Sequence, residues 1–263
     1  MTAEPIREIS LGRWRAQLLP RQPYESRYTA RDPALGFSYE TQAGTHAIAS
    51  DRMRPFRAMP NGLAFVPAGC SVYSHSKMGG EYLVLTGFEP GNGLDGPFSD
   101  RIDHRAIRAA QELRRLFLVP GNGDPLHREA LFVALVDCLH AQGSAPSHGQ
   151  GAQRWMTPAR LEQVFAFVEV NLASPLLVQD IADVLGLSAG FFSRAFRAVT
   201  GLAPYAYILD RRLAKVRASL ADGVCDLSRL AADTGFSSHA HMATQFRQRY
   251  GLAPSTFRDS LRS

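Results

Sequence analysis

The sequence predicts an α+β protein in two parts: a β-rich N-terminal half followed by helices, and an all-helical C-terminal half. Three observations support this fold class. Short apolar runs separated by glycine, proline and asparagine fill residues 1–90, apolar residues at helical spacing begin after Asp100, and one segment of the second half recurs about fifty residues later. A chain of 263 residues is long enough for two modest cores.

The N-terminal strands are predicted from apolar runs that end at turn residues. Short strands divided by such turns are typical of an antiparallel sandwich or barrel, which we expect for residues 1–100. The runs are GRWRAQLL (12–19), FSYETQAG (37–44), GLAFVPAG (62–69) and GEYLVLTGF (80–88).

Two helices are predicted in residues 101–142. Apolar residues every three or four positions between 107 and 117 indicate the first. The second begins at Asp124-Pro125, an N-cap followed by a proline at the first helical position, and is apolar around most of its girth. Such a helix needs more than one covering surface. Either the sheet and the first helix bury it within one chain, or it also pairs with its copy in a homodimer.

A boundary between the two halves is predicted at residues 143–153, GSAPSHGQGAQ, which lack periodic apolar residues and are rich in glycine and serine. The basic excess lies beyond this linker. From Gln153 onward 13 Lys+Arg stand against 9 Asp+Glu, whereas residues 1–152 hold 16 against 15. Nearly all the basic residues are arginines, and a guanidinium suits phosphate and guanine recognition better than an ammonium does.

The apolar runs and the cysteine spacing predict a cytoplasmic protein. The first residues contain no apolar stretch of signal-peptide length, and the longest apolar run, residues 130–136, is too short to cross a bilayer. Cys70, Cys138 and Cys225 lie far apart without CxxC spacing. We therefore expect three buried free thiols and neither a disulfide nor a zinc site.

The C-terminal half contains the same element twice. After the turn the offset between the copies is 50 residues, and FRxxxGLAP of residues 196–204 recurs at 246–254, so one residue has been added in the second turn. In each copy a short helix ends at a glycine and a serine then offers an N-cap, which is the helix-turn-helix arrangement of DNA-binding proteins. Before the added residue the offset is 49. Ala182, Gly186 and Ser188 of the first copy correspond to Ala231, Gly235 and Ser237 of the second.

A helix of roughly 18 residues is predicted between the copies, from Pro204 to Gly223, and would be about 27 Å long. Successive major-groove faces on one side of B-DNA recur every ~34 Å. The two copies are therefore predicted to enter adjacent turns of a duplex.

This pattern resembles the C-terminal domain of the AraC/XylS family of bacterial transcription regulators. The matching segments are IADVLGLSAGFFSRAFRAVTGLAP (181–204) and LAADTGFSSHAHMATQFRQRYGLAPSTFR (230–258). The resemblance implies a double helix-turn-helix DNA-binding domain at 154–263. Because family members often carry a cupin-like N-terminal domain, it also implies a cupin-like β-barrel at 1–100 that senses a small molecule or mediates dimerisation, with a helical extension at 101–142.

The function implied is that of a sequence-specific DNA-binding transcription regulator, a homodimer controlled by a small-molecule effector, with RNA polymerase as a further partner if it activates. The alternative is a cupin-type metalloenzyme with a helical accessory domain, and a third hypothesis keeps DNA binding but makes the N-terminal domain a dimerisation module alone. Cupin enzymes hold metal with an HxH pair. Here His46 stands alone and His75 is displaced, so no metal, cofactor or catalytic residue is predicted.

Residues that contact DNA are predicted from the faces of the second helix of each copy. In the first copy Phe192, Ala195, Phe196 and Val199 share the core-facing arc. Arg194 faces outward, and its guanidinium can pair with both O6 and N7 of guanine. The alternative is an arginine-rich face that serves solubility alone.

In the second copy Met242 and Phe246 face the core. The outward face holds few strong donors, so we expect thymine-methyl contacts, Thr244, and phosphate binding by Arg247. The residues predicted to contact DNA are Ser188, Gly190, Ser193, Arg194, Arg197, Ser237, His239, Ala240, Ala243, Thr244 and Arg247. Strand alternation predicts that Tyr39, His46, Tyr73 and Tyr82 line an effector cavity.

Overall fold

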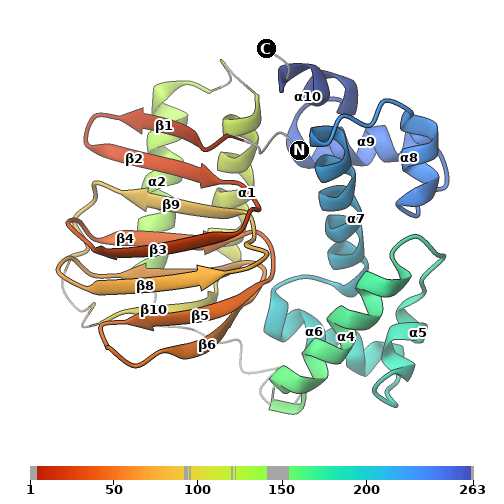
Figure 1. The fold of residues 1–263 in the computed structure, drawn as a ribbon, viewed down its shortest axis with the longest axis horizontal. Coiled ribbons are helices and arrows are strands. Elements are labelled where there is room, and N and C mark those ends of the chain that lie inside the picture. Colours follow the sequence, from red (N-terminus) through yellow and green to blue (C-terminus); the bar gives the residue numbers. More distant parts are fainter. Residues whose placement is uncertain are drawn as a thin grey trace. The chain divides into compact units, whose positions relative to one another are not determined.

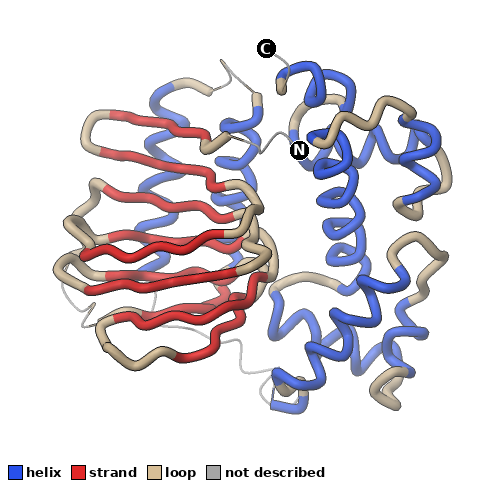
Figure 2. The backbone as a smooth tube through the Cα atoms, in the orientation of Figure 1, coloured by secondary structure: helices blue, strands red, loops and turns tan. Residues whose placement is uncertain are grey.

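The computed structural model describes residues 5–91, 94, 96–119, 121, 123–140 and 154–261. The chain divides between Ser144 and Ala145 into two compact units, a β-rich N-terminal unit and a helical C-terminal unit (Figures 1 and 2). The linker predicted at 143–153 lies outside the described residues. None of the described helices has the length and apolar character needed to span a bilayer.

The described strands of the N-terminal unit form two antiparallel sheets. One has the order β1-β2-β9-β4-β7-β10 and the other the order β3-β8-β5-β6. The strands are β1 (Arg7–Leu11), β2 (Trp14–Leu19), β3 (Tyr24–Thr29), β4 (Ala34–Ser38), β5 (Gln42–Ile48), β6 (Arg54–Ala58), β7 (Gly62–Val66), β8 (Ser71–Ser76), β9 (Tyr82–Thr86) and β10 (Phe98–Ile102).

The core of this unit lies on one face of the larger sheet. Alternate residues of the central strands meet as cross-strand pairs on this face, and all of them are almost completely buried. Because successive side chains of a strand point to opposite faces, this stripe follows directly from the apolar alternation in the sequence. The pairs are Ala16↔Leu85, Leu18↔Leu83, Leu35↔Phe65 and Phe37↔Leu63.

Helices α1 (His104–Leu118) and α2 (Pro125–His140) cover that face and lie behind the strands in Figure 1. The Trp14 and Phe132 rings lie 5.7 Å apart, and the Tyr39 hydroxyl donates to the carbonyl of Ala110 at 2.6 Å. Much of the wide apolar surface of α2 is therefore buried within one chain. Two large apolar side chains of α2 stay exposed, Leu126 at 72% and Val133 at 42%.

The predicted cupin-like β-barrel is not confirmed: the described strands form two open sheets. The segment 37–44, predicted as one strand, crosses between the sheets: β4 ends at Ser38 in the larger sheet and β5 begins at Gln42 in the smaller one. The edge strand β1 of the larger sheet packs against α1 and α2. These helices cover a sheet edge that would be absent in a closed barrel.

The C-terminal unit is helical throughout its described elements. Two aromatic clusters form its core, one around Phe165, Phe196 and Tyr207, the other around Phe246 and Phe257. The helices are α4 (Pro158–Asn171), α5 (Val178–Asp183), α6 (Ala189–Thr200), α7 (Pro204–Ala221), α8 (Leu227–Asp233), α9 (His239–Tyr250) and α10 (Pro254–Ser260). We call α5–α6 the first motif and α8–α9 the second motif; α7 connects them (Figure 1).

The cysteines differ in exposure. Cys70 and Cys138 are buried thiols, as predicted, whereas the Cys225 thiol is exposed. The prediction of burial is wrong for Cys225 because this residue lies in the turn between α7 and α8, where the chain runs over the surface.

Candidate nucleic-acid interface

Both motifs are closed by the same backbone hydrogen bonds. In the first motif the amide of Leu187 donates to the carbonyl of Ala182 at 3.0 Å. In the second motif the amide of Phe236 donates to the carbonyl of Ala231 at 2.9 Å. The glycine before each donor, Gly186 or Gly235, has a positive φ. The repeat in the sequence is therefore a repeat in three dimensions.

The N-caps of α6 and α9 show where the extra residue of the second motif lies. Ser188 caps α6 by accepting from the amide of Phe191 at 3.3 Å. Helix α9 is capped by Ser238, which accepts from the amide of His241 at 3.1 Å. The prediction that Ser237 is the cap is wrong. The added residue precedes the cap, so the cap that corresponds to Ser188 is Ser238, 50 residues later.

The inner face of α6 differs from the predicted one at its C-terminal end. Phe192, Ala195 and Phe196 are buried as predicted, but Val199 is only half-buried. Thr200 is fully buried instead, and its hydroxyl donates to the carbonyl of Phe196 at 2.9 Å. This hydrogen bond is what allows a polar residue in the core position.

The outer face of α6 presents two arginines to solvent. Gly190, Arg194 and Arg197 are exposed, whereas Ser193 is half-buried. A methyl group at residue 190 would lie 3.7 Å from Nη1 of Arg194, so this guanidinium extends back over the first turn of the helix. The N-terminal part of a recognition helix is the part that contacts base edges in a helix-turn-helix protein.

Pairing separates these two arginines from several other arginines of the unit. In the part of the chain that the structure describes, Arg194 and Arg197 have no acidic partner. By contrast, Arg211 pairs with Glu169, and Arg249 pairs with Asp210 at 2.7 Å. Guanidinium groups without an internal partner are available for phosphate or guanine.

The outer face of α9 is placed like that of α6 in its motif, but most of its side chains are shorter. His239, Ala240, Thr244 and Arg247 are exposed. Of the other residues of this helix, Ala243 is half-buried, and Met242 and Phe246 form the inner face at 0% exposure. Ser237, just before the helix, is exposed and lies 3.2 Å from Nδ1 of His241 through its Oγ.

Polar contacts from α7 join it to α9 of the second motif and to α4. Neighbouring residues in its middle bind opposite partners: Asp210 pairs with Arg249 of α9, and Arg211 pairs with Glu169 of α4. Arg212 adds hydrogen bonds of 2.9 Å to the carbonyls of Leu172 and Ser174. A clamped helix of this length, about 27 Å, is a rigid spacer for two DNA-contacting elements.

One residue that orders the first motif has no signal in the sequence. Gln179 of α5 reaches the turn with both ends of its amide group. Its Oε1 accepts from the amide of Ala189 at 3.3 Å, and its Nε2 donates to Asp183 at 2.6 Å. Only the fold brings a residue ten positions upstream to the start of α6.

The four residues predicted to line an effector cavity do not lie together. Tyr39 is buried against α1, and the hydroxyl of Tyr73 on the outer side of β8 donates to Glu25 at 3.1 Å. His46 and Tyr82 face the space between the two sheets. A methyl group at residue 36 would clash with the Tyr82 hydroxyl, so Gly36 provides the room for this side chain.

Further polar groups that sequence alternation missed lie between the sheets. The Tyr24 hydroxyl and Ser74 Oγ are 3.1 Å apart, and the His46 ring stacks on Phe56 at 4.9 Å. Burial raises the pKa of Tyr24 and Tyr82 and lowers the pKa of His46. These groups are therefore uncharged at neutral pH and suit a neutral polar ligand.

Comparison with known proteins gives a family match within the C-terminal unit and longer matches to regulators. Residues 181–260 match a family described as a helix-turn-helix domain. The HTH-type transcriptional activator RhaS of Escherichia fergusonii is 30% identical over 162 residues, which are 60% of this chain and 56% of that protein. The regulatory protein PocR of Salmonella typhimurium is 22% identical over 162 residues, 61% of this chain and 50% of that protein.

The chain thus spans about half the length of these curated relatives, which are named as regulators and not as enzymes. A solved transcriptional regulator from Chromobacterium violaceum, described as containing an AraC-type DNA-binding domain, is 27% identical. It covers 39% of this chain and 92% of its own, with a TM-score of 0.37.

Proposed function

We propose that the whole protein is a sequence-specific DNA-binding transcription regulator of the AraC/XylS family, because residues 181–260 match a helix-turn-helix family and two RhaS activators are 30% and 31% identical. The observation that carries the proposal is the outer face of α6, where Arg194 and Arg197 are exposed without an acidic partner among the described residues. A second motif with the same backbone lies at the other end of the clamped helix α7.

The two motifs divide the work of binding. Arg194 pairs with a guanine edge in the major groove, and Arg197 and the exposed residues of α9 bind phosphates or make apolar contacts with thymine. Ser188, Gly190, Ser193, Ser237, His239, Ala240, Ala243, Thr244 and Arg247 complete the proposed contact surface. Helix α7 sets the separation at which both motifs enter adjacent turns of the duplex.

The N-terminal unit serves as the sensor and dimerisation module of this cytoplasmic regulator. His46 and Tyr82, together with Tyr24 and Ser74, support a site for a neutral polar effector between the sheets. Leu126 and Val133, one heptad apart on the exposed side of α2, support pairing with a second copy. If the protein activates, RNA polymerase is its further partner.

The test is selection of bound duplexes from a random DNA pool by the purified full-length protein, followed by affinity measurements over a range of salt. We expect an enriched sequence and a linear fall of log affinity with log salt. Arg194→Ala relaxes the preference at one or two base pairs of that sequence. The matched control is Arg115→Ala, which removes one positive charge from an exposed site on α1 of the N-terminal unit.

The result that would overturn the function is an absence of sequence enrichment by the parent protein. An unchanged preference in Arg194→Ala would leave DNA binding intact but would show that α6 is not the specifying helix.

A further inference from the structure

Helix α6 is supported on one flank by a residue from outside its motif. Phe191 lies in the first turn of α6, about 100° around the helix axis from Gly190 on one side and from the buried Phe192 on the other. It therefore separates the outward face from the core face. Phe191 is half-buried, and the Trp155 ring lies 5.7 Å from its ring at an interplanar angle of 89°. Because Trp155 precedes α4 in the chain, only the fold brings these two rings together.

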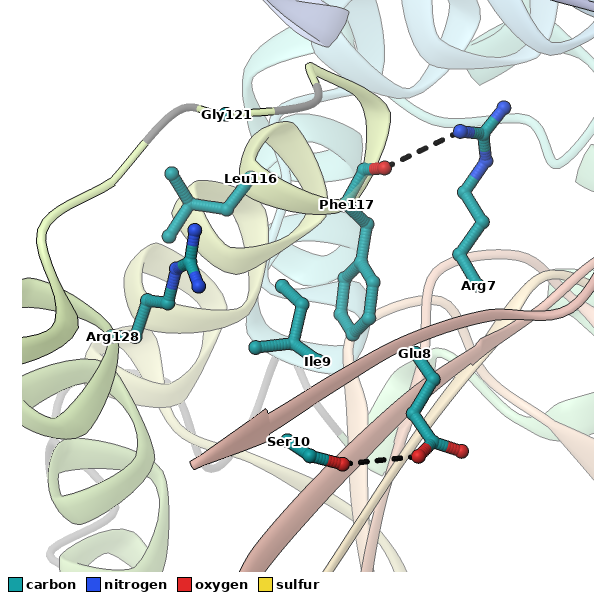
Figure 3. Close-up of a pocket in the computed structure, with 8 residues that line it drawn as sticks. All are labelled: Arg7, Glu8, Ile9, Ser10, Leu116, Phe117, Gly121 and Arg128. Carbon is teal, nitrogen blue, oxygen red and sulfur yellow. Dashed lines mark hydrogen bonds between the residues drawn. The ribbon is translucent and has the colours of Figure 1, made fainter. Parts of the chain in front are cut away.

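Trp155 is itself held in place by the start of α4. The guanidinium carbon of Arg160 lies 3.7 Å from the centroid of the indole ring, and Nη1 of Arg160 donates to the Trp155 carbonyl at 2.7 Å. The Thr157 amide donates to the same carbonyl at 3.0 Å. In the N-terminal unit an arginine also joins two elements through a carbonyl, since Arg7 of β1 donates to Phe117 of α1 at the longer distance of 3.4 Å (Figure 3). The indole is thus fixed through both its ring face and its backbone.

The corresponding flank of the second motif is supported from within that motif. At the offset of 50, His241 of α9 corresponds to Phe191 of α6. The His241 ring lies 5.6 Å from the Phe236 ring at 79°, and its Nδ1 is 3.2 Å from Oγ of Ser237. Phe236 and Ser237 both belong to the turn just before α9. The first recognition helix therefore depends on the segment that leads into α4, and the second depends on its own turn.

Support on the flank of α6 constrains a motion that its core contacts oppose less. On the core face the Phe196 ring lies 6.2 Å from Phe165 and 5.5 Å from Tyr207, and these contacts hold the helix against the rest of the unit. A contact on the flank resists rotation of the helix about its own axis. Such a rotation would move the Arg194 guanidinium sideways in a major groove, and a binding group must stay within about 10–20° of its productive orientation.

We propose that Trp155 is a positioning residue of the first recognition helix: through Phe191 it fixes the rotation of α6, and thereby the base-pair preference that Arg194 confers. The effect on base-pair preference rests on the proposed function. The placement of α6 by Trp155 is a property of the protein alone and is measured without DNA. Two tests therefore apply, one to each part of the proposal.

The first test is amide hydrogen exchange of the full-length protein without DNA. In Trp155→Ala we expect the amides of residues 192–195 to exchange about fivefold faster, the factor that corresponds to the roughly 1 kcal/mol of one aromatic pair. The amides of α9 keep their rates. Trp155→Phe retains an aromatic edge and restores most of the protection. The matched control is His241→Ala, which removes the corresponding ring of the second motif and leaves exchange in α6 unchanged.

The second test measures base-pair preference on the selected DNA sequence. Arg194→Ala identifies the base pairs whose preference depends on Arg194. Trp155→Ala should reduce the preference at the same base pairs by about tenfold, within the range that one bidentate contact contributes. The double variant of these two residues should lose little more than either single variant, because both changes act on one contact. Phe191→Leu keeps an apolar side chain without the ring, and it shows the same loss even if Trp155→Ala does not fold.

Three results would each overturn the proposal: unchanged exchange in α6 in both Trp155→Ala and Phe191→Leu, additive losses in the double variant, or an equal loss in His241→Ala at the base pairs that Arg194 contacts. A parent protein that enriches no DNA sequence would instead overturn the proposed function. The exchange rates of α6 would then decide by themselves whether Trp155 positions this helix, so the two failures are distinguishable.

Discussion

The two helix-turn-helix motifs share a backbone and differ in how their turns are supported. A methyl group on Gly186 in the first turn would meet no other atom within 4 Å. On Gly235 in the second turn it would lie 2.3 Å from the carbonyl oxygen of Leu172 and 2.9 Å from the Arg212 guanidinium. The first glycine is needed only for its positive φ, and the second also for the close approach of another chain segment.

The outer faces of the two recognition helices differ as well. At the offset of 50, Arg194 of α6 corresponds to Thr244 of α9, and Gly190 corresponds to Ala240. Backbone closure and inner aromatic residues are alike in both copies, while the side chains available to DNA are not. Folding therefore restricts which residues can occupy the inner face and the turn of each copy, and leaves the outer face free to differ.

The largest expected effect tests the turns. Gly235→Ala should lower the free energy of unfolding by about 3 kcal/mol, because positive φ costs about 1 kcal/mol and the overlap with a backbone carbonyl adds about 2. Gly186→Ala should cost about 1 kcal/mol. Urea unfolding followed by far-UV circular dichroism measures both. Equal losses would show that the second turn is no more tightly packed than the first.

The next effect tests the outer faces in binding to the selected DNA sequence. Arg194→Ala should weaken this binding by about 1–3 kcal/mol, because it removes a bidentate contact to guanine. Thr244→Ala, the same change at the corresponding position of α9, should cost about 0.5 kcal/mol or less, because a threonine offers one hydrogen bond to either base. Competition binding with single-base variants of the site gives both values, and a larger loss for Thr244→Ala would reverse the proposed division of roles.

A smaller effect tests the helix caps. Ser188→Ala and Ser238→Ala should each lower the free energy of unfolding by about 1 kcal/mol, because each leaves one N-terminal amide of a recognition helix without its acceptor. Ser237→Ala is the control and should have little effect, since the Oγ of Ser237 contacts only the half-buried side chain of His241 among the described residues. Thermal unfolding of the three variants decides whether the added residue precedes the cap.

The smallest effect concerns the phosphate contacts of the second motif. Arg247→Ala should weaken binding to all duplexes alike and reduce the slope of log affinity against log salt by about 1. Titrations at several salt concentrations with the selected site and a scrambled duplex measure this slope. A loss confined to the selected site would show that Arg247 contacts a base.

Local patterns predicted much of the helical unit correctly. The two glycines predicted to end the first helix of each copy, Gly186 and Gly235, both have a positive φ. The inner residues Phe192, Phe196, Met242 and Phe246 were also correct. Helical periodicity suffices for these because the residues that make each contact are three or four positions apart.

Prediction failed where the deciding contact is distant in sequence. Tyr39 alternates with its neighbours like a cavity residue, yet its hydroxyl bonds to Ala110, 71 positions away. The strand predicted at 37–44 is divided by a crossing between sheets that no local pattern marks. The N-cap was misplaced by one residue because two adjacent serines, Ser237 and Ser238, carry the same local signal.

By itself the sequence determined the duplicated motif, the glycines that end its helices and the helix between the copies, because each depends on residues close together in the chain. Only the tertiary structure decided which arginines are internal partners and which face outward: Arg249 meets Asp210 from another helix, and Arg194 meets no carboxylate in the described chain. An arginine has the same chemistry at every position, and its role is set by what the fold places within reach of its guanidinium.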